Sequence, residues 1–136
     1  LPIYAKGKNS REWINVEDHC AALFTLYLKG KIGESYNVGS GYNLTNLDVV
    51  KKILKNFKLM NVQISKKTKI KFVKDRPGHD FRYALNSKKI FKELKWKPKI
   101  NFESGLRDTI LWYLRNKNFI KKISKKKYEK RLGLTI

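Results

Sequence analysis

REWINVEDHCAALFTLYL, residues 11–28, contains the clearest change of periodicity in the chain. Polar and apolar residues alternate over residues 11–16, which predicts a strand. Asp18 then stands where a helix cap is expected, and an apolar run over residues 20–28 follows and ends at Gly30. Because apolar residues fall on most sides of this helix, we expect it to be buried.

The remaining sequence continues this mixture of strands and helices. A second helix begins after Thr45, because Asp48 stands three residues later in an arrangement close to a capping box. Helices mixed with short strands indicate an α/β layer structure. The other predicted elements are two strands, at residues 35–38 and 69–73, and two helices, at residues 87–94 and 103–116.

The formal net charge is +21, and its distribution is more informative than its size. Residues 1–50 carry five bases and five acids, whereas residues 51–136 carry 27 bases and six acids. Nearly all of these bases are lysines, and arginine, which best recognises phosphate and guanine, occurs only six times in the chain. The charge is therefore typical of a solvated surface with a basic tail, and we do not expect nucleic acid as a partner.

Other features narrow the class of protein. The single cysteine, Cys20, excludes an internal disulfide and a Cys-based zinc site. His19 and His79 are too isolated in the sequence to be metal ligands. No segment reaches the roughly 20 apolar residues of a membrane-spanning helix, and the opening residues lack the pattern of a signal peptide. We expect a cytoplasmic protein with no membrane partner. The chain begins at Leu1 without an initiator Met, which suggests truncation or processing.

Two patterns resemble dinucleotide chemistry but do not fit their context. Tyr4 and Lys8 spell the Tyr-x-x-x-Lys pair of the short-chain dehydrogenases, whose two side chains stack on one helix face. Pro2 and Gly7 argue against a helix here, so we interpret the match as accidental. Residues 39–41, Gly-Ser-Gly, lack the third glycine of a dinucleotide-binding turn and are interpreted as a structural turn.

A set of residues suited to a nucleotide diphosphate remains. Arg76 and His79 share a Pro-Gly loop, which can aim a guanidinium at a phosphate with little loss of entropy. Arg11 opens a predicted strand and could clamp the same dianion, and Tyr4 offers a flat face for a base. From spacing alone, the plainer interpretation is favoured: a surface arginine, a surface histidine and a core tyrosine.

The exact residues favour the nucleotide site over the plainer interpretation. Short sequence blocks typical of one protein family cover nearly the whole chain, in the order in which that family has them. The most discriminating block is Asp75-Arg76-Pro77-Gly78-His79-Asp80. The others are LPIY (1–4), GKN (7–9), REW (11–13), VEDH (16–19), GKIGE (30–34), YNVG (36–39), TNLDVV (45–50), RYA (82–84), EL (93–94), WKP (96–98), FESG (102–105) and WYL (112–114). Together these blocks closely resemble the dTDP-glucose 4,6-dehydratases of the extended short-chain dehydrogenase/reductase superfamily.

This resemblance implies the C-terminal portion of an extended short-chain dehydrogenase, an α/β fold. Residues 1–45 would include elements that complete the Rossmann-like sheet, residues 46–120 would form the small α/β substrate domain, and residues 121–136 would be the basic C-terminal tail. The glycine-rich NAD turn and the catalytic residues of the family would lie upstream of Leu1. We therefore expect no catalytic residue in this chain, which would be inactive alone.

The resemblance also implies a pocket for the dTDP part of a dTDP-glucose substrate. The family reaction oxidises the sugar at C4 with the cofactor NAD, eliminates water across C5 and C6, and returns the hydride to C6. The complete protein would be a lyase and a homodimer. By matched position, Pro2 and Tyr4 would lie against the thymine, Arg11 and Arg76 would bind the diphosphate, Asn46 and His79 would make polar contacts to the nucleotide, and Tyr128 would line the same pocket.

The sequence departs from the family pattern outside these matched positions. Ala5-Lys6 replaces Gly-Asp, Ser40 and Lys95 each replace a glycine, and Asn86 replaces an acidic residue. These differences concern the geometry of loops more than the identity of a ligand. Two alternatives stay open: the same portion of a related UDP-sugar epimerase or decarboxylase, and a basic nucleic-acid-binding protein.

Overall fold

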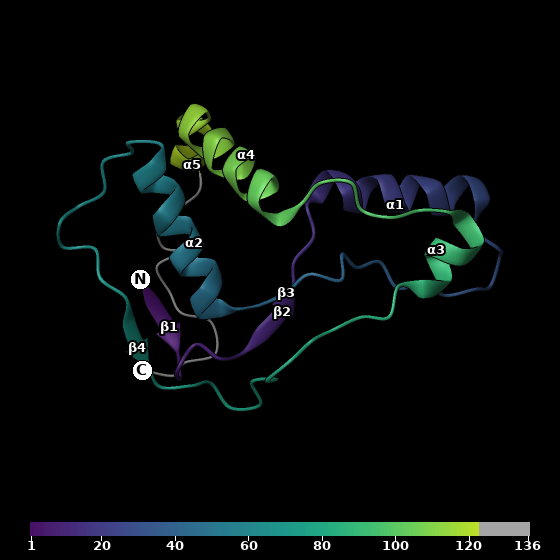
Figure 1. Ribbon diagram of the computed structural model, residues 1–136, viewed down its shortest axis with the longest axis horizontal. Coiled ribbons are helices and arrows are strands. Elements are labelled where there is room, and N and C mark those ends of the chain that lie inside the picture. Colours follow the sequence, from purple (N-terminus) through teal and green to yellow (C-terminus); the bar gives the residue numbers. More distant parts are fainter. Residues whose placement is uncertain (123–136) are drawn as a thin grey trace.

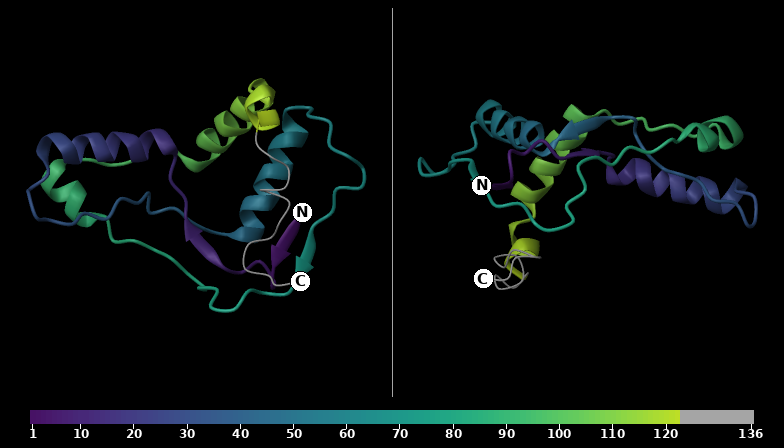
Figure 2. Two further views of the ribbon diagram at one scale, coloured as in Figure 1. Left: turned by 180° about the vertical axis from the view of Figure 1, so that it is seen from behind. Right: turned by 90° about the horizontal axis from the view of Figure 1, so that it is seen from below.

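Pairs of three-residue strands hold together helices that spread over an elongated molecule (Figure 1). The computed structural model describes residues 1–122. In two further views, α1 and α3 again lie together at one end, and α2, β1 and β4 lie at the other (Figure 2). The elements are β1 (Pro2–Tyr4), β2 (Ser10–Glu12), α1 (Val16–Lys29), β3 (Asn43–Thr45), α2 (Asn46–Leu59), β4 (Lys71–Val73), α3 (Lys88–Leu94), α4 (Phe102–Arg115) and α5 (Lys117–Lys122).

The strands form two separate pairs. β1 runs parallel to β4, with Ile3 opposite Phe72, and β2 runs antiparallel to β3, with Arg11 opposite Leu44. The predicted strand at residues 69–73 is thus present as β4. The strand predicted at residues 11–16 is present only as β2, because residues 13–15 leave the strand and lead into α1 at Val16.

The strand predicted at residues 35–38 is absent from the part of the chain that the structure describes. A strand needs a neighbour for its backbone N–H and C=O groups, and no described segment pairs with these residues. Tyr36 and Val38 instead pack against a small core formed by Ala22, Ile90 and Trp96. This core joins α1 to α3 and to the segment that follows α3.

α1 begins earlier than the sequence pattern indicated, and Asp18 is not its cap. The N-cap is Asn15, whose side chain accepts a hydrogen bond of 2.8 Å from the backbone N–H of Glu17. Asp18 is buried, and its carboxylate accepts hydrogen bonds from the backbone N–H groups of Lys99 (2.9 Å) and Ile100 (2.8 Å). The prediction of a cap was wrong because this carboxylate binds a segment 81 residues away.

The prediction that α1 is buried is also wrong for the described residues. Ala22 is fully buried, but one broad face of the helix carries large apolar side chains that are exposed. They are Val16 (70%), Leu23 (52%), Phe24 (63%), Tyr27 (83%) and Leu28 (59%). The apolar surface of α1 is therefore larger than the part that α3 and the adjacent segments cover.

The predicted start of α2 is confirmed. Thr45 is the N-cap: its hydroxyl accepts a hydrogen bond from the backbone N–H of Asp48 (3.1 Å) and donates one to the Asp48 carboxylate (2.6 Å). The Thr45 hydroxyl thus satisfies one donor of the first turn, and the carbonyl oxygens of Asn9 and Gly7 accept from the backbone N–H groups of Asn46 and Leu47. The helices predicted at residues 87–94 and 103–116 are present as α3 and α4, with ends that differ by one residue.

Two of the departures from the family pattern lie in left-handed backbone. Ala5 follows β1 with a φ of 47°, and Lys95 ends α3 with a φ of 56°. This conformation costs a non-glycine residue about 1–2 kcal/mol, because Cβ approaches the following carbonyl oxygen. The geometry explains why glycine suits both positions, and it shows that alanine and lysine can adopt the same conformation.

The two hydrogen bonds of Asp18 make a testable contribution to stability. Asp18→Asn removes the charge and leaves one oxygen to accept one of the two bonds, so we expect the free energy of unfolding to fall by about 2 kcal/mol. Denaturant unfolding measures this change. The control is Asp108→Asn on exposed α4 surface, which should change stability by less than about 0.5 kcal/mol. Equal stability of the two variants would contradict the role of Asp18.

Candidate functional site

The segment that follows the Pro-Gly loop runs along the free edge of β2. Ser10 donates a backbone hydrogen bond to Phe81 (2.8 Å) and accepts one from Tyr83 (3.2 Å). The carbonyl oxygen of Asp80 accepts two further bonds, from the side-chain amide of Asn9 (3.2 Å) and from the guanidinium of Arg11 (3.0 Å). β2 therefore holds the end of the loop at a fixed place.

Arg11 is held on three sides. Its Nη1 donates to the carbonyl of Ser10 (2.7 Å), its Nη2 donates to the carbonyl of Asp80, and its guanidinium carbon lies 4.6 Å from the centre of the Tyr83 ring. The ring face attracts the cation and also fixes the plane of the guanidinium. These bonds use two of the five guanidinium N–H groups. The guanidinium is therefore fixed in position and keeps further N–H groups that can donate to a ligand.

Tyr83 connects the two arginines of the predicted site. Its hydroxyl donates a hydrogen bond to the carboxylate of Asp80. This bond, followed by the negative charge of Asp80, raises the pKa of Tyr83 above its ordinary value of 10.0. The positive charges of Arg11 and Arg76 act on the same phenol in the opposite direction. Of the two arginines, Arg11 lies against the Tyr83 ring, and Arg76 acts on the phenol through its charge.

His79 forms a pair with Asp75 inside the loop. Its Nδ1 lies 2.6 Å from the Asp75 carboxylate, which also accepts the backbone N–H of Arg76 (3.0 Å). The bond to His79 is the main cause that lowers the pKa of Asp75 below its ordinary value of 3.8. The His79 side chain is only 5% exposed, and the Tyr4 ring meets it edge-on, with ring centres 5.7 Å apart. The pair orients the imidazole, and Nδ1 carries the proton because an ionised carboxylate only accepts.

The structure brings most of the predicted site residues into one region. Tyr4 contacts His79, and Arg11 binds the carbonyl of the residue that follows His79. Asn46 is the first residue of α2, and its backbone N–H donates to Asn9 (2.9 Å), two residues before Arg11. The remaining predicted residues are Pro2, exposed on β1; Arg76, exposed in the loop; and Tyr128, which lies outside the described residues.

Sequence reasoning missed several residues that shape this region. The spacing of Asp75 and His79, four residues apart across a Pro-Gly turn, was an available signal for an orienting carboxylate. Tyr83 and Asn9 stood in blocks that resemble the family, but no local pattern predicted their contacts with Arg11 and Asp80. These contacts join residues more than 70 positions apart, which a reading of local periodicity cannot supply.

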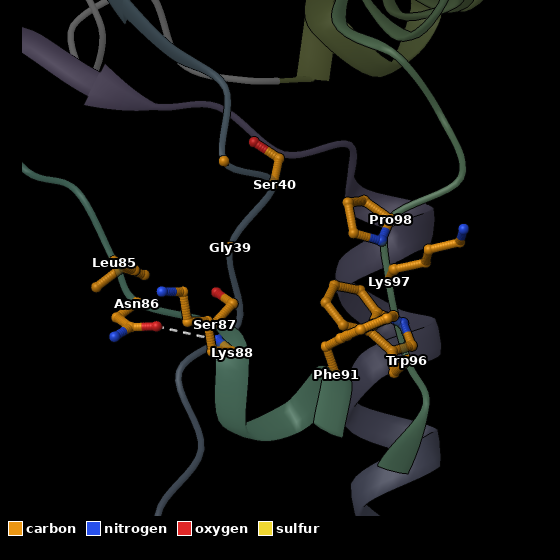
Figure 3. A pocket seen from close by; sticks show the side chains of 11 residues that line it. Gly39, Ser40, Leu85, Asn86, Ser87, Lys88, Phe91, Trp96, Lys97 and Pro98 are labelled. Atoms are coloured by element: carbon orange, nitrogen blue, oxygen red, sulfur yellow. Dashed lines mark hydrogen bonds between the residues drawn. The ribbon is translucent and has the colours of Figure 1, made fainter. Parts of the chain in front are cut away.

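A separate open cavity of about 530 Å³ lies next to this region (Figure 3). None of the predicted site residues within residues 1–122 lines it. Figure 3 shows Ser40 on one side, Leu85 and Asn86 on another, and Trp96 and Pro98 opposite them. The described residues of the predicted nucleotide site therefore lie outside this cavity.

The two patterns that resembled dinucleotide chemistry are structural. Tyr4 ends β1 and Lys8 follows a turn, so the pair does not share a helix face. Residues 39–41 lead into β3 instead of a helix, and no helix N-terminus is available there for a pyrophosphate. Among the described residues, no cluster of His, Cys, Asp or Glu could hold a metal ion, and no helix is long and apolar enough to cross a membrane.

The class of protein follows from a comparison with family models. The model described as GDP-mannose 4,6 dehydratase matches residues 1–109, so the chain belongs to this family. Within it, the chain is similar to the dTDP-glucose 4,6-dehydratase of Shigella flexneri, with 45% identity over 130 residues, 95% of this chain and 36% of that protein. It is 49% identical over 123 residues, 85% of this chain, to the enzyme of the same name from Haemophilus influenzae, and again spans 36% of it.

A solved structure gives the same result for the fold. The crystal structure of dTDP-glucose 4,6-dehydratase from Bacillus anthracis, in complex with NAD, superimposes with a TM-score of 0.77 at 40% identity. The match covers 88% of this chain and 36% of that chain. The prediction of the C-terminal portion of an extended short-chain dehydrogenase is therefore confirmed, and the chain spans about 36% of the length of these relatives.

The pair of Asp75 and His79 predicts a pH dependence. Because the pKa of Asp75 is lowered in the folded protein, the pair stabilises the loop fully above about pH 3.8, and this stabilisation is lost as the pH falls through the lowered value. A carbon-13 NMR titration of the Asp75 carboxyl group should give a midpoint below 3.8. His79→Ala should return the midpoint toward that value. A midpoint that His79→Ala leaves unchanged would show that another group lowers the pKa.

Proposed function

We propose that the complete protein containing this chain is an NAD-dependent dTDP-glucose 4,6-dehydratase, a lyase that converts dTDP-glucose to dTDP-4-keto-6-deoxyglucose and water. The observation that carries the proposal is the similarity to dehydratases of that name, at 45% and 49% identity over 95% and 85% of the chain. In this proposal the described residues bind the nucleotide part of the substrate.

The cluster around β2 supports binding of a nucleoside diphosphate. Arg11 is preoriented by Ser10, Asp80 and Tyr83, so little side-chain freedom would be lost when it binds a phosphate oxygen. Arg76 supplies a second positive charge near the same phenol. Two arginines on one side of a dianion form charge-assisted hydrogen bonds, which are among the strongest in proteins.

The other assigned residues suit the base and the sugar of the nucleotide. Tyr4 and the oriented His79 lie in contact at the end of β1, where one offers an aromatic surface and the other a polar ring. Pro2 precedes Tyr4 on the same strand and is assigned to the thymine with it. Asn46 lies across from Asn9 at the start of α2, and Tyr128 remains a predicted member of the pocket.

We assign NAD to the part of the relatives that this chain does not match. The described residues do not fit the cofactor, because the Gly-Ser-Gly turn at residues 39–41 does not open a helix. No redox or elimination step is therefore attributed to residues of this chain. A cytoplasmic location and a homodimer complete the proposal for the whole protein.

The arrangement of α1 supports the proposal that residues 1–45 complete a Rossmann-like sheet. Residues 36–38 pack on the core between α1 and α3 but have no strand partner in the described region. The exposed face of α1, from Val16 to Leu28, is wide enough to cover further apolar surface. We infer that in the complete protein both features contact a part that corresponds to the unmatched region of the relatives.

The inferred contact of α1 predicts that its exposed face matters in the complete protein. Phe24→Ser should lower the free energy of unfolding by at least about 2 kcal/mol, since a covered phenylalanine contributes about that much or more. Leu59→Ser on α2 is the control, because Leu59 is 70% exposed and Phe24 is 63% exposed in this structure. Thermal unfolding of both variants gives the comparison. Equal effects would mean that the face of α1 stays in water.

The proposed activity predicts a preference among nucleotides. The complete protein should release the 4-keto-6-deoxy sugar nucleotide from dTDP-glucose, and calorimetry should show tighter binding of dTDP than of UDP. Arg76→Ala should raise the Michaelis constant for dTDP-glucose about 10- to 100-fold, because a charge-assisted hydrogen bond contributes about 1.5–3 kcal/mol. Arg107→Ala on exposed α4 is the control and should leave the constant unchanged.

Other outcomes would contradict the proposed activity or the proposed role of Arg76. Preference for UDP would favour an epimerase or a decarboxylase of the same superfamily. Weak binding of both nucleotides, together with steeply salt-dependent binding of RNA, would favour the nucleic-acid alternative. An Arg76→Ala variant with an unaltered Michaelis constant would remove Arg76 from the site.

A further inference from the structure

Glu12, the residue after Arg11, closes a junction between three distant segments. One carboxylate oxygen accepts the backbone N–H of Gly41 at 2.6 Å, and the other accepts the backbone N–H of Leu85 at 2.7 Å. Each oxygen therefore binds a different loop. Both bonds are charge-assisted, and they join positions 29 and 73 residues away from Glu12.

The turn at residues 39–41 is shaped around this carboxylate. A Cβ atom on Gly39 would lie 2.9 Å from the carboxyl carbon of Glu12, which is too close for a real contact. A side chain at this position would displace the carboxylate. The turn is also fastened to the chain beyond Glu12, since the Ser40 hydroxyl donates to the carbonyl of Trp13 at 2.5 Å. Figure 3 shows Gly39 and Ser40 along one side of the cavity and Leu85 on another.

The second bond of Glu12 fixes the segment that carries the surroundings of Arg11. Leu85 is two residues from Tyr83, whose ring supports the guanidinium, and five residues from Asp80, whose carbonyl accepts from it. Ser10 binds this segment at one end through Phe81 and Tyr83, and Glu12 binds it at the other end through Leu85. Tyr83 is 52% exposed, so its place depends on these backbone anchors more than on burial.

We propose that Glu12 is a positioning residue that acts through Arg11: its carboxylate fixes residues 83–85, so that Tyr83 and Asp80 hold the Arg11 guanidinium ready to bind a phosphate of the substrate. The inference rests on the proposed function in one respect, the role of Arg11 as a ligand of the diphosphate. Glu12 itself does not contact the substrate in this proposal.

Glu12→Gln tests the proposal with little change in size. The amide retains one acceptor oxygen but turns its NH₂ group toward the second backbone N–H, so one of the two bonds must break. In the complete protein, we expect the dissociation constant of dTDP to rise about tenfold, the equivalent of about 1.4 kcal/mol. Gly39→Ala, whose Cβ would displace the Glu12 carboxylate, should also raise the dissociation constant.

Glu93→Gln is the matched control. The Glu93 carboxylate also joins separate segments, since it accepts from the Tyr36 hydroxyl at 2.9 Å and lies 3.6 Å from Lys31. It belongs to the α1 and α3 end of the molecule, away from Arg11 (Figure 1). We expect this variant to bind dTDP within twofold of the parent protein.

A double-mutant cycle separates positioning from a general structural effect. In an Arg11→Ala background, Glu12→Gln should change dTDP binding by less than about twofold, because the residue on which Glu12 acts is gone. An equal loss of affinity with and without Arg11 would overturn the proposal. So would a Glu12→Gln variant that binds dTDP as tightly as the parent protein.

Amide hydrogen exchange distinguishes failure of this inference from failure of the proposed function. Glu12→Gln should increase exchange at Leu85 or Gly41, and at Tyr83, whether or not a nucleotide binds. A parent protein that binds no dTDP would refute the nucleotide-binding function while leaving this readout intact. Unchanged exchange at all three amides would refute the role of Glu12 itself.

Discussion

The backbone of Ser10 is the point on which the candidate site depends, because β2 is bonded along both edges. β3 pairs with one edge, and residues 81–83 bond to the other, so three segments that are far apart in the chain meet at one short strand. The Pro-Gly loop ends at this junction, and Arg11 extends from it. A three-residue strand has little stability alone, so the side-chain bonds of Asn9, Arg11 and Glu12 to the same neighbours are part of what keeps the junction closed.

Local features of the fold were predictable from the sequence, and long-range ones were not. The cap of α2 at Thr45 and the loop at residues 76–80 follow from residues within a few positions, and both are present. Asp18 was misassigned because its partners lie in a segment more than 80 residues away. The same limit applies to the site. The sequence blocks that resemble the family supplied candidate binding residues, but the contacts of Tyr83 and Glu12 could be found only in the folded chain.

Two glutamates bind lysines of the lysine-rich part of the chain, residues 51–136. Glu103 bonds Lys52 and so links α4 to α2, and Glu34 bonds Lys89 and holds the loop after α1 against α3. These bonds raise the pKa of both lysines. Such exposed pairs contribute little stability individually. Their main effect is to hold α4 against α2 and the loop after α1 against α3.

The left-handed backbone at Ala5 and Lys95 has a consequence for how this chain can diverge from its relatives. Each residue tolerates a conformation that suits glycine, at a cost of about 1–2 kcal/mol. The turn after β1 and the end of α3 are imposed by the hydrogen bonds around them, such as that from Gly7 to Tyr4 and that from Lys95 to Phe91. The surrounding backbone hydrogen bonds therefore set the shape of the chain at these two positions, and residues other than glycine can occupy both turns.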